Sequence, residues 1–229
     1  MTTEKKTYPV TLKGELTIPP ARGWWLLKWL LGFPHYFLLF FLWIAFLCVC
    51  VISFFAILFT GKHPKGLFDY KVGVLRWTWR VGFYSYGALG TDKYPPFSLN
   101  PDPDYPADLD IPYPEKMSRG LVLVKWWLLA IPHYIIVGFL TGGWTWKMHE
   151  WNWPMGDRIW HTDKWQIGGE GSGLIFVLAF FAGICLLFIG KYPKDLFKLV
   201  IGFNRWVLRV GAYVTLMTDE YPPFRLWDD

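Results

Sequence analysis

The chain has 229 residues, of which 53% are hydrophobic and 21% aromatic, and its mean hydropathy is +0.24. This composition is too apolar for an ordinary soluble domain and indicates a membrane protein. The formal net charge of +5 comes from basic residues interleaved with apolar ones, which favours anionic lipid over nucleic acid as a partner. The three cysteines lie in apolar runs without the spacing of a zinc site or a disulfide framework, and the polar segment 1–16 does not resemble a secretory signal.

Two short segments have the pattern of β-strands. Apolar and polar residues alternate over Tyr8–Ile18, which predicts a half-buried strand that ends at Pro19. A weaker alternation recurs at Tyr105–Ile111, inside the acidic and proline-rich linker 91–119. We therefore expect a second short strand there, with the first strand as its partner.

The apolar run Gly23–Phe59 exceeds the roughly 20 residues that one membrane crossing needs. Its beginning, from Arg-Gly through Lys-Trp to Pro-His, returns in the second half of the chain. The spacing that follows differs between the halves. His35 and Gly61 are 26 positions apart, whereas the matching His133 and Gly190 are 57 positions apart.

The extra length in the second half is a polar, Trp-rich insert, 141–172. Because a charged insert cannot lie in the middle of a bilayer, its counterpart in the first half, near Leu42–Ala45, is expected at a membrane surface. This favours two short crossings in each half. No glycine, proline or asparagine marks a turn at 41–45, so an interfacial helix followed by one long crossing at 34–59 is the alternative. The favoured crossings are 24–42, 44–59, 121–140 and 173–189.

The stretch Thr60–Phe97 recurs at Ile189–Phe224, with Gly-Lys-x-Pro-Lys, Arg-Trp-x-x-Arg-Val and Tyr-Pro-Pro-Phe in the same order. In each copy the basic residues have helical spacing on an apolar and aromatic helix. A crossing would place arginines near its centre at a cost of roughly 2.5–3.5 kcal/mol each. We therefore expect helices that lie in the membrane plane or across the ends of the crossings. Their predicted contacts with lipid headgroups are Lys65, Arg76, Arg80, Lys194, Arg205 and Arg209, and pairing with Asp69, Asp92 or Asp219 is the alternative.

Two crossings per half would place both termini, the linker and both Gly-Lys-x-Pro loops on one side of the membrane. Every Lys and Arg would then lie on that side or in flanking helices, except Lys147, Arg158 and Lys164. The positive-inside rule makes that side cytoplasmic.

The run Thr60–Asp69, the segment Arg76–Val81 and the closing Thr91–Leu99 resemble a family of bacterial membrane proteins known only as domain of unknown function 4389. The Pro-His that follows each apolar run fits the same family. The resemblance spans nearly the whole chain as two tandem copies and implies a bacterial integral membrane protein, but no activity and no catalytic residue. The insert is not part of it, and Lys198 stands in the second copy where the first has Asp69.

Two further sets of residues are candidates for binding. His35 and His133 occupy matching places and could hold a metal, a haem or a chlorin, although a structural histidine bonded to backbone or lipid is the simpler interpretation. Aromatic residues are enriched at protein contacts. We therefore expect the insert to bind a partner protein through Trp144, Trp146, Trp151, Trp153, Trp160 and Trp165.

Together these features predict an all-α integral membrane protein with short cytoplasmic β-strands, built from repeats at 1–100 and 101–229. Each repeat would hold a transmembrane hairpin and an interfacial amphipathic helix, in the bacterial inner membrane with both termini cytoplasmic. No P-loop, Gly-x-Ser-x-Gly or paired-carboxylate motif is present. We therefore expect a non-catalytic accessory or scaffold subunit of a membrane complex, without a cofactor or a metal. The alternative is a small transporter or lipid-handling protein with a path between the repeats.

Overall fold

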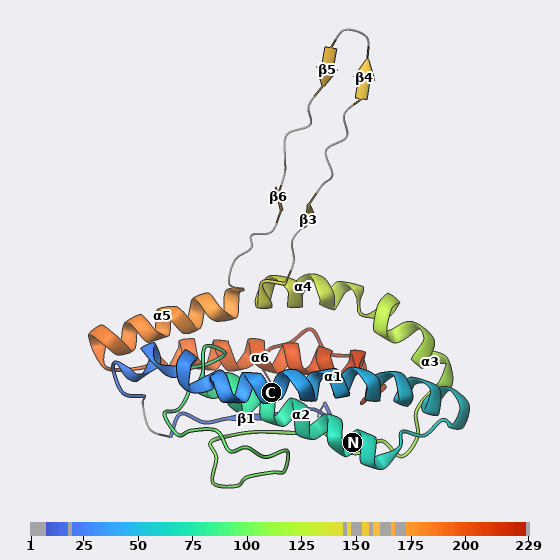
Figure 1. Cartoon of the computed structure of the whole chain (residues 1–229), viewed down its shortest axis with the longest axis horizontal. Coiled ribbons are helices and arrows are strands. Elements are labelled where there is room, and N and C mark those ends of the chain that lie inside the picture. Colours follow the sequence, from blue (N-terminus) through green and yellow to red (C-terminus); the bar gives the residue numbers. More distant parts are fainter. Residues whose placement is uncertain are drawn as a thin grey trace, which may run out of the picture.

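The computed structural model describes residues 8–17, 20–143, 146–147, 153–155, 158–160, 166–167 and 173–227 (Figure 1). This part of the chain is mostly helical. The helices are α1 (Lys28–Thr60), α2 (Lys65–Tyr84), α3 (Arg119–Val124), α4 (Ile131–Thr141), α5 (Leu174–Ile189) and α6 (Lys194–Val214), with a 3-10 turn η1 (Trp24–Leu26) and a π-helical turn η2 (Lys125–Leu129).

The predicted pair of strands near the N-terminus and in the linker is present in shorter form. β1 (Thr11–Gly14) and β2 (Ala107–Asp110) pair antiparallel, with Leu12 opposite Leu109. The apolar side chains of both strands are buried in the core, as their alternation predicted. The insert contributes two further antiparallel pairs, β3 (Trp146–Lys147) with β6 (Gln166–Ile167) and β4 (Trp153–Met155) with β5 (Arg158–Trp160).

The first half contains one long helix where we expected two crossings, at 24–42 and 44–59. α1 runs without a break from Lys28 to Thr60, and Pro34 lies inside it. The prediction was wrong because no residue at 41–45 can stop a helix, so backbone hydrogen bonding continues through that point. The helix ends where Gly61 adopts φ +70, a left-handed conformation that glycine accepts without strain.

The second half forms the same helix with two modifications. Seven positions separate Lys28 from His35, but eight separate Lys125 from His133, and the π-helical turn η2 absorbs the added residue. The other modification is the insert, which lies between α4 and α5 in the sequence. A Cβ on Gly173 would lie 2.2 Å from the Thr141 carbonyl carbon, so α5 begins where α4 ends. We call α3, η2, α4 and α5 together the composite helix.

α1 is, in the described part of the chain, the one helix long and apolar enough to cross a membrane by itself. The segments Arg119–Leu129 and Ile131–Thr141, which meet at a bend of 49°, make a second candidate if they act as one span.

The two halves are interlocked. Arg119 from the second half packs on Gly61, and a Cβ there would lie 3.3 Å from its Nε. Arg22 from the first half packs in the same way on Gly190, with 2.7 Å between the corresponding atoms. The beginning of each long helix therefore lies beside the end of the other. α1 runs from left to right in Figure 1 and the composite helix from right to left, with α2 and α6 packed beside them.

Candidate functional site

The first feature that occurs in both halves is an aromatic enclosure around a buried histidine, which we call the histidine clasp. Trp77 Nε1 donates a hydrogen bond of 3.0 Å to Nδ1 of His35. Phe97 stacks on the imidazole with ring centroids 4.0 Å apart, and Tyr94 lies beside it at 4.8 Å. The Tyr-Pro-Pro-Phe segment thus covers the Pro-His of α1, and His35 has no exposed surface.

The second half repeats this geometry. Trp206 Nε1 donates to Nδ1 of His133 over 3.2 Å. Phe224 stacks on the ring with centroids 4.4 Å apart, and Tyr221 lies at 4.9 Å. Neither clasp was expected from the sequence, although the signal was there, because Pro-His and Tyr-Pro-Pro-Phe recur in the same order.

The clasps favour the simpler interpretation of His35 and His133 as structural histidines over a role as ligands of a metal or a haem. An imidazole nitrogen that accepts a hydrogen bond from Trp carries the lone pair, so the proton of the neutral ring is on Nε2. Nε2 then has no lone pair to offer a metal, and Nδ1 is already occupied. Both Nε2 atoms are buried, and none of the described residues offers them a well-placed acceptor.

We expect Trp77→Phe to lower the free energy of unfolding by about 1–3 kcal/mol, because it leaves Nδ1 of the buried His35 without a donor. The substitution also removes part of the buried indole, so the loss combines the hydrogen bond with the contacts of those atoms. Thermal unfolding in detergent measures it, and Trp206→Phe in the second clasp provides a matched variant with a loss of similar size. No loss in either variant would contradict a structural role for the clasps.

The second repeated feature is a set of contacts around a buried lysine, which lies seven or eight positions before each histidine. We call this set of contacts the lysine clasp. Lys28 donates to the Thr91 carbonyl over 2.7 Å and pairs with Asp92 at 2.9 Å, and its ammonium lies 4.9 Å from the centre of the Tyr84 ring. The other carboxylate oxygen of Asp92 accepts from the backbone N–H of Ala21. The loop residues Thr91 and Asp92 therefore hold the start of α1.

Lys125 makes the same three contacts in the second half. It donates to the Thr218 carbonyl over 3.0 Å, pairs with Asp219 at 2.7 Å and lies 5.5 Å from the Tyr213 ring. Asp219 also accepts from the backbone N–H of Ser118. The pairing with Asp92 and Asp219 that we left open for the arginines is made by these lysines.

The arginines of α2 point into the protein. Arg80 has no exposed surface and donates to Asp108 over 3.1 Å and to the Asn100 carbonyl over 2.9 Å. Arg76 lies 3.0 Å from the same carboxylate and donates to the Leu99 carbonyl over 2.9 Å. Arg76 and Arg80 thus face β2 and the linker, where protein acceptors bind the guanidinium groups that we expected to meet lipid phosphates.

The remaining predicted contacts differ in their exposure. Arg205 donates to the Leu226 carbonyl and the buried Arg209 to the Arg225 carbonyl, so both contact the C-terminal segment. Lys65 and Lys194 are exposed at the first turns of α2 and α6. Of the predicted partner-binding residues, Trp144, Trp151 and Trp165 lie outside the described residues, and Trp146, Trp153 and Trp160 are described only as strand backbone.

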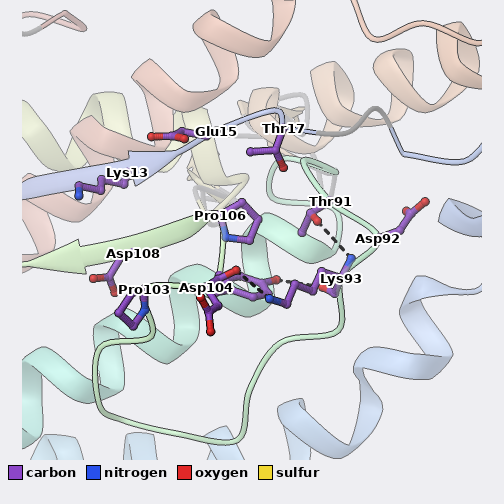
Figure 2. Close-up of a pocket in the computed structure, with 11 residues that line it drawn as sticks. Lys13, Glu15, Thr17, Thr91, Asp92, Lys93, Pro103, Asp104, Pro106 and Asp108 are labelled. Atoms are coloured by element: carbon purple, nitrogen blue, oxygen red, sulfur yellow. Dashed lines mark hydrogen bonds between the residues drawn. The ribbon is translucent and has the colours of Figure 1, made fainter.

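A polar pocket of about 470 Å³ lies between the β1 segment and the loop that carries the first lysine clasp (Figure 2). Lys93 crosses its floor and donates to the Asp104 carbonyl over 2.7 Å. Two of the acids that line it, Asp92 and Asp108, are already paired with Lys28 and with Arg76 and Arg80. The pocket therefore lies directly outside these buried ion pairs, and the paired aspartates form part of its lining.

A buried lysine of α2, Lys71, links the two halves of the chain. Lys71 has no exposed surface, and its ammonium donates to the Thr215 carbonyl, just after α6, over 2.6 Å. Burial lowers the pKa of Lys71 to about 8. His63 lies nearby, and burial together with the positive charge of Lys71 lowers the pKa of its ring to about 4.

His63 makes the protein sensitive to acid. The unfolded chain protonates this histidine below about pH 6.5, whereas the folded protein does so only below about pH 4, so stability falls as the pH drops through that window. We expect His63→Phe, which keeps the ring against Phe68, to weaken this dependence. Unfolding temperatures of the two proteins at pH 7, 5.5 and 4 test it, and equal acid losses in both would contradict it.

Comparison with known proteins agrees with the repeat. A family model described as Domain of unknown function (DUF4389) matches residues 23–98 and 170–225, together more than half of the chain. The chain belongs to this family. The two matched segments are consistent with two copies of the DUF4389 domain, as the sequence predicted. The first holds a whole histidine clasp and a whole lysine clasp, and the second holds Trp206, Asp219 and the Tyr-Pro-Pro-Phe that complete the other pair. No curated protein and no solved structure matches the chain.

Proposed function

We propose that this DUF4389 protein is a membrane-embedded, non-catalytic accessory or scaffold protein of a bacterial membrane complex. The observation that carries the proposal is the surface of the long helices, where large apolar side chains stay exposed along their length. The exposed fractions of four phenylalanines illustrate it: Phe33 66%, Phe59 71%, Phe139 69% and Phe188 76%. Exposed apolar patches of this extent need lipid or another protein against them.

The buried polar groups support a structural role. The histidines, lysines and arginines that recur in the two halves bond to tryptophans, aspartates and backbone carbonyls of the same chain. Within the described ranges no three His, Cys, Asp or Glu residues gather in a way that could hold a metal ion. These groups hold the helices together, which is what a scaffold requires.

The insert is the part of the chain through which we propose partner binding, because it carries six tryptophans and interrupts a helix that the first half forms without it. Its removal is easy to design. α5 begins where α4 ends, so joining Thr141 directly to Gly173 restores a helix like α1.

Purification from native membranes in mild detergent tests the proposal. We expect the wild-type protein to resist extraction by alkaline carbonate and to migrate with other membrane proteins, and the variant lacking 142–172 to stay in the membrane but migrate alone. A wild-type protein that leaves the membrane with carbonate, or that is a lone monomer at native expression, would overturn the proposal. A variant that keeps its partners would show that the insert does not bind them.

One observation favours lipid handling as a second function. An apolar groove of about 550 Å³ separates α1 from η2 and the end of α6, lined by Cys50, Phe54, Trp126 and Leu216 among others. It fits an acyl chain better than a polar solute. The transporter alternative, with a path between the repeats, gains no support from His35, His133 or Arg80, whose side chains are held in the clasps and ion pairs. Lipid that stays bound through purification, and is lost on Phe54→Asp, would support this function.

A further inference from the structure

We propose that the protein is held in the cytoplasmic leaflet alone, with α1 and the composite helix lying parallel to the membrane surface. Their exposed apolar faces would contact the acyl chains of one leaflet, and the linker, the strands and the lysine clasps would lie on the cytoplasmic side. This inference rests on the proposed membrane location and replaces the four crossings expected from the sequence.

The course of the linker is the first argument. At one end of α1, Asp92 accepts from the Ala21 N–H, and at the other end the Met117 N–H donates to the Gly61 carbonyl over 3.0 Å. The linker therefore spans the length of α1, which is about 50 Å for 33 residues. If α1 stood across the bilayer, this acidic and largely irregular segment would pass through the hydrocarbon, where such backbone is not tolerated.

The exit point of the insert is the second argument. The chain leaves the composite helix between Thr141 and Gly173, which corresponds to the middle of α1. The insert carries charged residues that cannot lie at the centre of a bilayer. α4 and α5, with 11 and 16 residues, are each shorter than the roughly 20 residues of one crossing. A helix that lies in the plane avoids this conflict, because its middle is as close to water as its ends.

The antiparallel arrangement of the halves is the third argument. The contacts of Arg22 with Gly190 and of Arg119 with Gly61 place the two lysine clasps at opposite ends of the helix pair. If these helices crossed the membrane, one basic copy would face outward, against the positive-inside rule. With the helices in the plane, both copies lie on the same side.

The burial of α1 agrees with this placement. Its buried residues form one narrow stripe along the whole helix, from Lys28 to Ile57, and large apolar side chains are exposed over the same length, from Trp29 to Phe59. The apolar face is thus longer than the roughly 30 Å of hydrocarbon that a crossing helix would meet. An in-plane helix can bury all of it in the acyl region of one leaflet.

Single-cysteine labelling of the full chain tests the inference. In a variant with Cys48→Ala, Cys50→Ala and Cys185→Ala, one cysteine is introduced at exposed Lys93, near the start of α1, or at exposed Lys62, just after its end. A membrane-impermeant maleimide is added to inside-out and to right-side-out vesicles. We expect both positions to react in inside-out vesicles and neither to react in right-side-out vesicles.

Reaction of Lys62→Cys and Lys93→Cys from opposite sides would overturn the single-leaflet placement and leave the membrane location intact. Val51→Cys, in the middle of α1 and 58% exposed, separates the two proposals. We expect it to stay unlabelled in both vesicle types and to react once detergent is added. Its labelling from water without detergent would overturn the membrane location itself.

Discussion

Asp108→Asn should lower the free energy of unfolding by about 3 kcal/mol, one of the two largest losses that we expect from a single substitution. The Asp108 carboxylate lies 3.0 Å from Arg76 Nε and 3.1 Å from Arg80 Nη2. Arg80 has no exposed surface, and the loss of one member of a buried ion pair leaves an uncompensated charge inside the protein. For a chain of this size we expect the unfolding temperature in detergent to fall by about 6–12 °C.

Asp110→Asn is the matched control for this prediction. Asp110 follows Asp108 on the same strand and contacts Arg76 at 3.3 Å, but its side chain is 67% exposed. Exposed pairs contribute about 1 kcal/mol or less, so this variant should unfold within a few degrees of the wild type. Equal and small effects at both positions would show that Asp108 does not hold the arginines.

The sequence predicted the local elements well where one simple pattern decided them. The alternation at Tyr8–Ile18 and Tyr105–Ile111 identified both strands and their pairing, because only one face of such a strand can meet a core. The ends of α5 and of the insert were also placed closely, since glycine marks both positions.

The orientation of α2 could not be predicted in the same way. Helical spacing of Arg76 and Arg80 identifies a polar stripe but does not say which environment it faces. The sequence left lipid headgroups and pairing with Asp69, Asp92 or Asp219 as alternatives, whereas the partner in the structure is Asp108 of β2. The pairing of linker with helix depends on contacts between residues about 30 positions apart, and no local pattern reports these.

The error in α1 has a different origin. A correct premise, that a charged insert cannot lie at mid-bilayer, was combined with the assumption that the helices stand across the membrane. The structure keeps α1 continuous at the point that matches the insert. A helix lying in the membrane plane satisfies the premise without the turn that the sequence lacks.

Asp92→Asn and Asp219→Asn should each lower the free energy of unfolding by about 3 kcal/mol, and by similar amounts, because each leaves a buried lysine without its anion. The side chains of Lys28 and Lys125 are 1% and 0% exposed. The second substitution Lys28→Met should restore much of the loss caused by Asp92→Asn, since the double variant buries no unpaired charge.

Asp69→Asn, at an exposed position on α2, is the control and should unfold like the wild type. Thermal unfolding in the same detergent compares all four variants. A double variant no more stable than Asp92→Asn alone would mean that the charge of Lys28 is not what the clasp holds, because the amide oxygen of Asn can still accept from the Ala21 N–H.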